Sequence, residues 1–489
     1  MEYKDIPRTL KRYSFAEKMN MLQKWSRKTM NLTGVISENE SGNLPYPWEL
    51  ETLLLFAVTA QEWQQGRFHE RDRKFEEIVN CIRNHMHSAI KQLEGTPELV
   101  NEVFVAIGAV QFELQEYPYY KLYRYHWCFA FSNDRINMPS RFCEKFGCDY
   151  KDFAVFALLL WSIFSREVPE HAQKETVYRA VCAKFQSVRT QLTITREDFK
   201  RQLESIASCI DDYMYCLRPS YTYPFIQDGD ATYLPLPHLL FRAVTSSMLY
   251  RMTQGDDSLE RIIGKEVLEE YLYQIIQRSG MFDEVYPEQT FRYGRDEGRS
   301  LDVLARKGDH FVFFDSKMYV PKRDLRIFKQ VAYQQEIQRL AKSCKQIYEH
   351  IRHRFPSRYN PFHCEDPVKA DNIYGLVVVR DNPYIGINSI YTETASLLKI
   401  PLDSPEYDWL CHHVGIVSLS RIECFCFTHS NLPDHIYGSK KREKPTDFWL
   451  TEGADSRKLR DVEFQAFRKD LVDSCRAVIK EFSETGFFS

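Results

Sequence analysis

The stretch SLDVLARKGDHFVFFDSKMYV, residues 300–320, decides how the second half of the chain folds. It contains two largely apolar runs, Leu301–Arg306 and His310–Met318, which are separated by a short polar connection. The turn is expected to be centred on Lys307-Gly308, because glycine supplies the positive φ angle that tight hairpin turns require. The pattern therefore predicts a β-hairpin.

The second run of this hairpin changes from apolar to polar side chains without a break, at Asp315, Ser316 and Lys317. A further carboxylate, Asp302, lies on the preceding strand. Carboxylates at a buried or half-buried strand end are costly unless they pair with a cation or hold a metal ion. The stretch is therefore a candidate active site.

The length of the hairpin loop decides whether these polar residues meet, because side chains alternate between the two faces of a strand. With a two-residue loop Asp302 lies opposite Phe313. Asp302, Asp315 and Lys317 then emerge on one face, and the two aspartates are diagonal neighbours. A four-residue loop gives the same result, whereas a three-residue loop would place the aspartates on opposite faces. An even loop is thus a geometric requirement of the site.

The side chains on this face favour metal-dependent chemistry. Two close carboxylates repel each other, and one is expected to keep its proton unless a cation neutralises the pair. Oxygen ligands with room for water and a phosphate suit Mg²⁺ or Mn²⁺ rather than zinc. Lys317 can stabilise an attacking hydroxide or the charge that grows on a phosphate. The arrangement indicates phosphodiester cleavage; the alternative is a salt bridge between Lys317 and one of the aspartates.

Upstream of the hairpin, the segment GKEVLEEYLYQII, residues 264–276, predicts a helix that carries three acidic residues. Glu266 shares a helix face with Glu269 or Glu270. One of the three is expected to complete the acidic cluster, and the spacing leaves the choice among them open.

Downstream, the segment DLRIFKQVAYQQEI, residues 324–337, predicts a second helix. Its spacing sets Gln330, Tyr333 and Gln334 on one stripe, with Lys329 beside it. The stripe either faces the active site or is a solvated helix face.

The composition is that of an ordinary soluble protein, and the length of 489 residues favours two domains. Hydrophobic residues make up 44%, charged residues 27%, and the net charge is -3, so neither disorder nor membrane insertion is indicated. The longest apolar run, Phe153–Phe164, is too short to cross a bilayer. The N-terminus has no secretion signal, and 13 scattered cysteines favour reduced thiols, so a cytoplasmic protein is expected.

A proline-rich segment, Arg218–Leu240, marks the expected domain boundary. Residues 1–235 then form a mainly helical domain, and residues 236–489 form an α/β domain, which together make the fold class α+β. Expected helices in the first domain are 49–63, 73–93, 98–116, 153–164 and 176–189, with an N-cap at Thr195 for another. The second domain is expected to run helix 258–278, strand 284–293, the hairpin, helix 324–351 and strand 373–380, an αβββαβ order. Strands 414–419 and 422–428 and a helix 456–482 follow.

Two other motifs have competing interpretations. The aromatic stretch Glu116–Phe131 either stacks and clamps nucleic acid or forms an aromatic core seam or strand, and the core is favoured. Cys424, Cys426 and His429 either bind zinc or are buried core residues on an apolar strand. No CxxC partner exists for them, so buried thiols are favoured.

The second half of the chain resembles the PD-(D/E)XK nuclease superfamily. The resemblance lies in a helix Glu, then Asp302, then Asp315-Ser316-Lys317, then Lys329-Gln330 with Tyr333 and Gln334. The DSKMY and KQVAYQQ portions are similar to restriction endonucleases of the LlaJI type and related antiphage nucleases. The resemblance covers about 80 to 120 residues. It implies a restriction-endonuclease-like α/β nuclease domain with a mixed central sheet.

The resemblance also implies roles for the matching residues. Metal ligands would be Asp302, Asp315, the Ser316 carbonyl and Glu269, the last directly or through a water. Lys317 would position or activate the attacking water, and Gln330 and Tyr333 would orient the lysine or the phosphate. Glu269 is favoured over Glu266 and Glu270 because it follows the large apolar Leu268. Leu301 departs from the family by replacing its proline.

A basic strip begins beside the proposed metal site. Residues 321–358 contain ten Lys or Arg against three acidic residues. Such a strip is the electrostatic footprint expected for tracking a phosphate backbone, and the alternative is a solvated helix. The residues expected to contact nucleic acid are Lys322, Arg323, Arg326 and Lys329.

Together these features predict a Mg²⁺- or Mn²⁺-dependent DNA endonuclease in restriction or antiphage defence, with a helical domain for recognition or regulation. No phosphate-binding loop motif is present, so a nucleotide-driven motor would be a separate NTPase or defence-system subunit. Cutting both strands needs two active sites, so a homodimer is expected. The alternatives are a non-catalytic protein that binds nucleic acid or an ATPase, and an RNase of the same fold.

Overall fold

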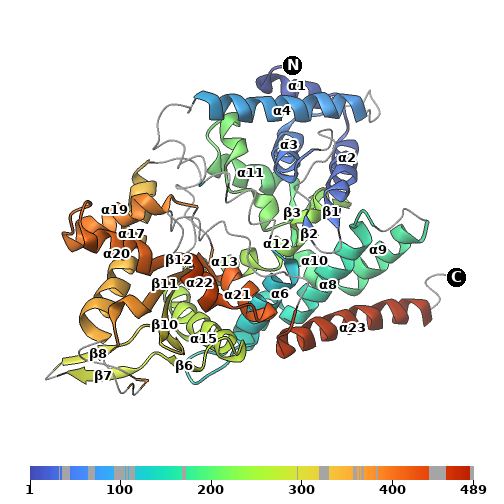
Figure 1. The fold of residues 1–489 in the computed structure, drawn as a ribbon. Coiled ribbons are helices and arrows are strands. Elements are labelled where there is room, and N and C mark those ends of the chain that lie inside the picture. The colour runs from blue at the N-terminus through green and yellow to red at the C-terminus, as the bar shows by residue number, and fades with distance from the viewer. Residues whose placement is uncertain are drawn as a thin grey trace. The chain divides into compact units, whose positions relative to one another are not determined.

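Helices run through the whole chain, and most strands lie in its second half (Figure 1), so the fold is mixed α+β. The structure is a computed structural model. It describes residues 1–31, 34–35, 45–63, 72–92, 105, 108, 116–167, 172–293, 296–318, 330–355, 361–362, 364, 368–381, 384–439 and 459–484.

The chain divides into two units. Unit 1 comprises residues 1–132, 137–254 and 467–489, and unit 2 comprises residues 133–136 and 255–466. The sheet that carries the hairpin lies entirely in unit 2.

Unit 1 is built mainly of helices. They are α1 (Ile6–Leu10), α2 (Phe15–Lys28), α3 (Pro47–Thr59), α4 (Asp72–Gln92), α6 (Pro118–Ala130), α7 (Met138–Phe146), α8 (Tyr150–Phe164), α9 (Ala172–Lys184), α10 (Gln186–Gln191), α11 (Arg196–Ile206), α12 (Leu240–Ala243) and α13 (Ser246–Thr253). The last helix, α23 (Val462–Glu484), begins in unit 2 and continues into unit 1. The strands are β1 (Met30–Asn31) with β2 (Gly34–Val35), and a three-stranded sheet of β3 (Thr193–Thr195), β4 (Phe225–Asp228) and β5 (Ala231–Tyr233).

The predicted boundary between residues 235 and 236 differs from this division by about twenty residues. The 3₁₀ turn η5 (Pro237–Leu239) packs against α2, and α12 packs against α8. Leu239 and Leu240 are completely buried. The segment after the prolines therefore completes the core of unit 1 before the chain enters unit 2.

Several predicted helices of unit 1 are confirmed. The segment 153–164 lies in α8, the segment 73–93 corresponds to α4, and the segment 49–63 corresponds to α3, which ends at Thr59. The Thr195 side chain accepts a hydrogen bond from Asp198 N–H as the N-cap of α11. The predicted helix 176–189 is interrupted at Phe185, between α9 and α10. The predicted helix 98–116 lies almost wholly outside the described residues.

The aromatic stretch 116–131 is the helix α6 and not a strand. Tyr120, Leu122, Tyr125 and Phe129 are buried, so the core interpretation of its aromatic residues is confirmed. The spacing of apolar residues that is typical of a helix, three and four positions apart, cannot be recognised in this stretch, because nearly every position carries a large amphipathic side chain.

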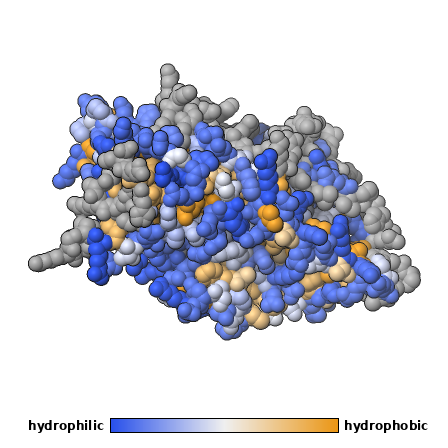
Figure 2. Space-filling view, turned by 60° about the horizontal axis from the view of Figure 1, so that its bottom comes forward, coloured by the Kyte–Doolittle hydropathy of each residue, from blue (hydrophilic) through white to orange (hydrophobic). Residues whose placement is uncertain are grey.

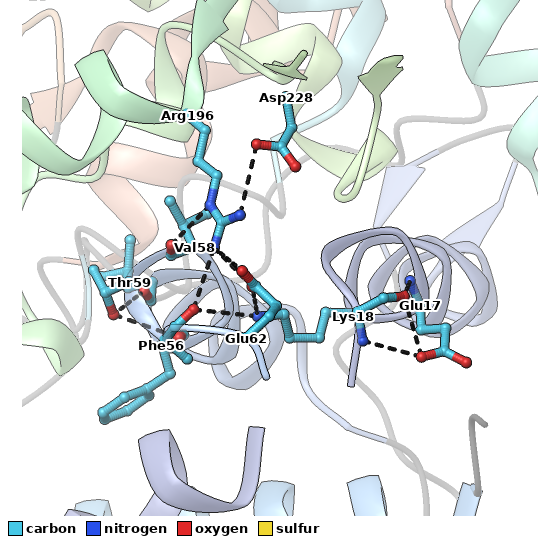
Figure 3. Close-up of polar contacts among 11 residues, drawn as sticks. Glu17, Lys18, Phe56, Val58, Thr59, Glu62, Arg196 and Asp228 are labelled. Carbon is cyan, nitrogen blue, oxygen red and sulfur yellow. Dashed lines mark hydrogen bonds and ion pairs between the residues drawn. The ribbon is translucent and has the colours of Figure 1, made fainter. Parts of the chain in front are cut away.

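Unit 1 also buries charge at the C-terminal end of α3 (Figure 3). Lys18 Nζ and the Arg196 guanidinium both donate to the carbonyl of Ala60, 3.5 and 3.2 Å away, and both pair with Glu62. Cations at a helix C-terminus interact favourably with its dipole and satisfy its last carbonyls. Arg196 also stacks on Phe15, 4.2 Å from the ring centre. The cluster joins α2, α3 and α11.

Unit 2 contains the following elements. Helical segments are α14 (Asp257–Ile262), the π-helical turn η6 (Ile263–Leu268), α15 (Glu269–Arg278), α17 (Gln330–Glu349), the π-helical turn η7 (His350–Arg354), α19 (Ile387–Leu398), α20 (Pro405–His413), α21 (Leu419–Thr428) and α22 (Leu432–Ser439). Strands are β6 (Glu284–Pro287), β7 (Thr290–Tyr293), β8 (Asp296–Arg299), β9 (Val303–Lys307), β10 (His310–Lys317), β11 (Ile373–Val379) and β12 (Val414–Ser418).

The central sheet of unit 2 is mixed and has the order β12-β11-β10-β9-β6. Strands β6, β9 and β10 are antiparallel neighbours, and β10, β11 and β12 are parallel. The elements α15, β6, β9, β10, α17 and β11 occur in the predicted αβββαβ order, with β7 and β8 between β6 and β9. Strands β7 and β8 form a separate ribbon, which extends away from the sheet at the lower left of Figure 1.

The helix α17 approaches β11 closely because position 375 is a glycine. A Cβ atom there would lie 2.1 Å from Cγ2 of Ile347, which no side-chain packing tolerates. On β10, the rings of Phe311 and Phe313 pack against Phe355, which follows η7. These contacts fix α17 and its extension over the strand that carries Asp315.

Three predictions for unit 2 need correction. The segment 422–428 is part of helix α21, so Cys424 and Cys426 lie on a helix and not on a strand. Cys426 is completely buried, as the core interpretation requires, and Cys424 is half-buried. The single strand 284–293 is two strands, β6 and β7, that belong to different sheets. The helix predicted for 258–278 contains the π-helical turn η6.

Hydrophilic side chains predominate on the face of the molecule in Figure 2, where hydrophobic ones form small separate groups. Among the helices of the described segments, none combines the length and the apolar character that crossing a bilayer would need. The long apolar helix α8 is instead a core helix of unit 1, where Phe156 and Leu160 are completely buried.

Candidate active site

The hairpin has a two-residue turn, as the site requires, but the turn lies one residue later than predicted. Lys307 pairs with His310, so Gly308 and Asp309 form the turn. Gly308 has a φ of +57°, and glycine at the first of two turn positions is typical of a hairpin turn that follows the strand twist. Asp283 fixes this position, because Gly308 N–H donates to its Oδ2 at 2.8 Å. The sequence did not reveal this anchor.

The shifted turn changes the partner of Asp302. Val303 pairs with Phe314 of β10 and with Pro287 of β6, so these three residues form one row across three strands. Phe313 pairs with Leu304, so Asp302 does not lie opposite Phe313 as predicted. Continued by one residue beyond the last pairs, the same register would place Asp302 between Asp315 and Glu288. Neighbouring strands are about 4.8 Å apart, so this register would bring the three carboxylates together at one end of the sheet.

Asp302 lies in the bend before β9 and is largely buried, at 9% exposure. Its Oδ2 accepts hydrogen bonds from Ser316 N–H at 2.6 Å and from the Ser316 hydroxyl at 2.9 Å. Burial raises the pKa of Asp302, and the Lys317 charge and the Ser316 hydrogen bonds oppose that rise. Ser316 therefore orients this carboxylate across the hairpin.

Asp315 is buried to 1% exposure on β10. Its Oδ2 lies 2.7 Å from Nζ of Lys317, whose side chain is 31% exposed. Burial, and then the neighbouring Asp302 charge, raise the pKa of Asp315 to about 7 although Lys317 opposes the rise. The predicted salt bridge is present, and it is part of a cluster with excess negative charge.

The structure separates the three candidate glutamates of the upstream helix. Glu266 binds Arg135 at 2.5 Å and Asn133 at 3.2 Å, and Glu270 accepts from Gln274 at 2.7 Å. Glu269 is the one near the hairpin: burial, and then the Asp302 charge, raise its pKa to about 8. The role of Glu269 as the helix acid of the site stays a prediction.

Glu288 is a member of the cluster that the sequence did not reveal. It follows β6, and its charge raises the pKa of both Glu269 and Asp315. Lys265 Nζ lies 2.7 Å from Glu288 and 2.8 Å from Glu269. The position could have been found only from the register of β6 on β9, which local sequence patterns do not give.

No family model, curated protein or solved structure matches the chain. The chemistry available at this site therefore follows from its own residues: four carboxylates, the two ammonium groups of Lys265 and Lys317, and the Ser316 hydroxyl.

The remaining predicted site residues lie downstream. Gln330 opens α17, and only its backbone is described. Tyr333 is on the first turn of α17 and is 5% exposed, so it is not on a solvated face. Its role in orienting Lys317 or a phosphate stays a prediction. The predicted nucleic-acid contacts Lys322, Arg323, Arg326 and Lys329 lie outside the described residues.

The donor set at the strand ends is small. In the described ranges of the chain, no group of three or more His, Cys, Asp or Glu side chains is arranged to hold a metal ion by itself. Asp302 and Asp315 offer two carboxylates, and Ser316 adds a backbone carbonyl at the same strand end. Mg²⁺ is usually bound by one or two carboxylates, several waters and substrate phosphates, so these residues fit that ion.

Proposed function

We propose that the chain is a Mg²⁺- or Mn²⁺-dependent endonuclease of the PD-(D/E)XK type that hydrolyses phosphodiester bonds in DNA. The observation that carries the proposal is the pair of buried aspartates, Asp302 in the bend before β9 and Asp315 on β10, with Lys317 two residues beyond the second aspartate. The αβββαβ order and the mixed sheet support it, because β9 and β10 are neighbours in the sheet and bring the two aspartates to the same end of it.

The electrostatics of the cluster support a divalent cation. Burial and mutual repulsion raise the pKa of Glu269, Asp302 and Asp315. A fold gains nothing from collecting carboxylates that its own environment drives toward protonation, whereas a divalent cation would compensate them. Asp302 and Asp315 would hold the ion with the Ser316 carbonyl, and Glu269 would bind it directly or through water. When bound, the ion would lower the pKa of an attacking water and neutralise a phosphate oxygen.

The side chains of the chain itself would supply orientation and charge. Lys317 lies within reach of Asp315 and is partly exposed, so its ammonium group can hold the attacking water and approach a phosphate. Ser316 locks the Asp302 carboxylate, which keeps the ligand oxygens at fixed positions. Gln330 and Tyr333 of α17 would orient the lysine or the scissile phosphate.

The wider biological setting belongs to the same proposal. The basic strip from Lys322 would follow the DNA backbone, and unit 1 would recognise the target or regulate cleavage. We place the enzyme in cytoplasmic restriction or antiphage defence, as a homodimer that cuts both strands, with any nucleotide-driven motor on a separate subunit.

The test is cleavage of DNA and of RNA by the purified full chain in Mg²⁺ and in a chelator. We expect Mg²⁺-dependent cleavage of DNA, reduced about 100-fold or more by Asp315→Asn and Lys317→Ala. Lys307→Ala is the matched control, since this lysine also pairs with an aspartate but at the turn end of the hairpin. Full cleavage by either site variant contradicts the assignment. Cleavage of RNA alone favours the ribonuclease alternative. A wild type that neither cleaves nor binds Mg²⁺ favours the non-catalytic alternative.

A further inference from the structure

The ammonium group of Lys265 lies between two carboxylates at the edge of the candidate active site. Its Nζ is 2.8 Å from Glu269 and 2.7 Å from Glu288. The glutamates come from α15 and from the connection between β6 and β7, so the lysine joins the helix to the end of the sheet. Their side chains are only 20% and 27% exposed, so water screens these contacts incompletely.

The charges of the cluster leave room for one divalent cation. The cluster contains four carboxylates and two ammonium groups. Lys317 forms an ion pair with Asp315, and Lys265 forms ion pairs with both Glu269 and Glu288. With all six groups ionised, a charge of about -2 remains. Arg299 approaches Glu288 only to 3.6 Å and is 65% exposed, so it compensates little.

The position of Lys265 is fixed by the packing of the π-helical turn η6. Next to it, Glu266 is held by Arg135 and Asn133. On its other side, Gly264 lies so close to β10 that a Cβ atom there would be 3.2 Å from Cβ of Met318. The turn therefore rests on the end of the strand that carries Lys317, and π-helical turns of this kind occur frequently at functional sites.

We propose that Lys265 takes the place of a second divalent cation, so that the site holds one metal ion, on the side of Asp302 and Asp315. Glu288 is the residue that secures the lysine in that place. The inference rests on the proposed function and determines its metal stoichiometry. Phosphodiesterases that use two metal ions keep them about 3.5 to 4 Å apart between shared carboxylates. In this site the Lys265 ammonium group already bridges Glu269 and Glu288, the two carboxylates beside the proposed metal position at Asp302 and Asp315.

The experiment is a titration of the full chain with Mn²⁺ alone, without nucleic acid, followed by calorimetry and by electron paramagnetic resonance. The wild type is expected to bind about one equivalent. Lys265→Met removes the charge and keeps an unbranched side chain that is one atom shorter, so it is expected to bind about two equivalents with spin coupling between the ions. The double variant Lys265→Met with Glu288→Gln is expected to return to about one. Lys307→Met is the matched control and should behave as the wild type.

Each result decides. A wild type that binds about two equivalents overturns the inference and leaves the metal-dependent nuclease intact. A Lys265→Met variant that melts cooperatively in a chelator and still binds one equivalent also overturns it. If Lys265→Met does not fold, Lys265→Gln takes its place in the titration, where about two equivalents support the inference and about one overturns it. A wild type that binds no Mn²⁺ overturns the proposed function itself, and the inference with it.

Discussion

Replacing Asp315 by asparagine should stabilise the metal-free protein at pH 8. The Asp315 carboxylate is buried beside Asp302, and its pKa is about 7 in the folded chain, against about 3.9 in an unfolded one. The folded state therefore holds this proton more tightly, so stability falls as the pH rises from about 4 to about 7. At pH 8 the ionised group costs at most about 4 kcal/mol. Part of this is shared with Asp302 and Glu269, so we expect a gain of about 2 kcal/mol for Asp315→Asn.

The assay is calorimetric melting of the full chain in a chelator at pH 8 and at pH 5. At pH 8 the variant should melt several degrees above the wild type, and at pH 5 the difference should shrink because the wild-type carboxyl is then protonated. Asp283→Asn is the matched control at the other end of the hairpin. The Gly308 N–H and then Lys307 lower the pKa of Asp283, so its replacement should not stabilise. A lower melting temperature for Asp315→Asn at pH 8 would refute the reasoning.

Three further predictions concern metal, a buried histidine and the sheet. Mg²⁺ at about 100 times its dissociation constant should stabilise the wild type by about 2.7 kcal/mol, and Asp302→Asn should remove this shift in a thermal melt. His350→Leu should raise the free energy of unfolding by about 1 to 2 kcal/mol in urea at pH 7, since neither ring nitrogen of this buried histidine has a hydrogen-bond partner among the residues that the structure describes. Burial lowers the pKa of His350 to about 4, so the wild type should also lose stability as the pH falls from about 6.5 to about 4, and the variant should not. Gly375→Ala should destabilise by about 2 kcal/mol or more in the same assay, because its Cβ would collide with Ile347.

The sequence was most informative where one hydrophobic period dominates a segment. The two apolar runs of the hairpin with their glycine turn, and the continuous apolar run of β11, specified strands, and the order αβββαβ followed from them. The prediction from the sequence was wrong at 422–428, where alternating cysteine and phenylalanine indicated a strand although the segment is part of helix α21. A short apolar run is compatible with both the helical and the strand period. The packing of this segment in unit 2 determined that it is a helix.

The candidate site was predictable in its local part only. Asp302, Asp315 and Lys317 follow from loop parity, which is a local property of the hairpin. The placement of Asp302 beside Asp315 depended on the exact turn position, which Asp283 fixes from a distant segment. Glu288 depends on the register of β6, and the choice of Glu269 depends on Arg135 holding Glu266. Both are long-range contacts that one sequence does not display.

The most direct test of the central claim is the position of a bound ion. Crystals of the full chain soaked in Mn²⁺ should show an anomalous-scattering peak about 2.0 to 2.3 Å from carboxylate oxygens of both Asp302 and Asp315, absent in Asp315→Asn crystals. A wild-type crystal with no peak at these two carboxylates, or with the same peak retained in Asp315→Asn, would contradict the assignment of this strand end as a metal-dependent active site.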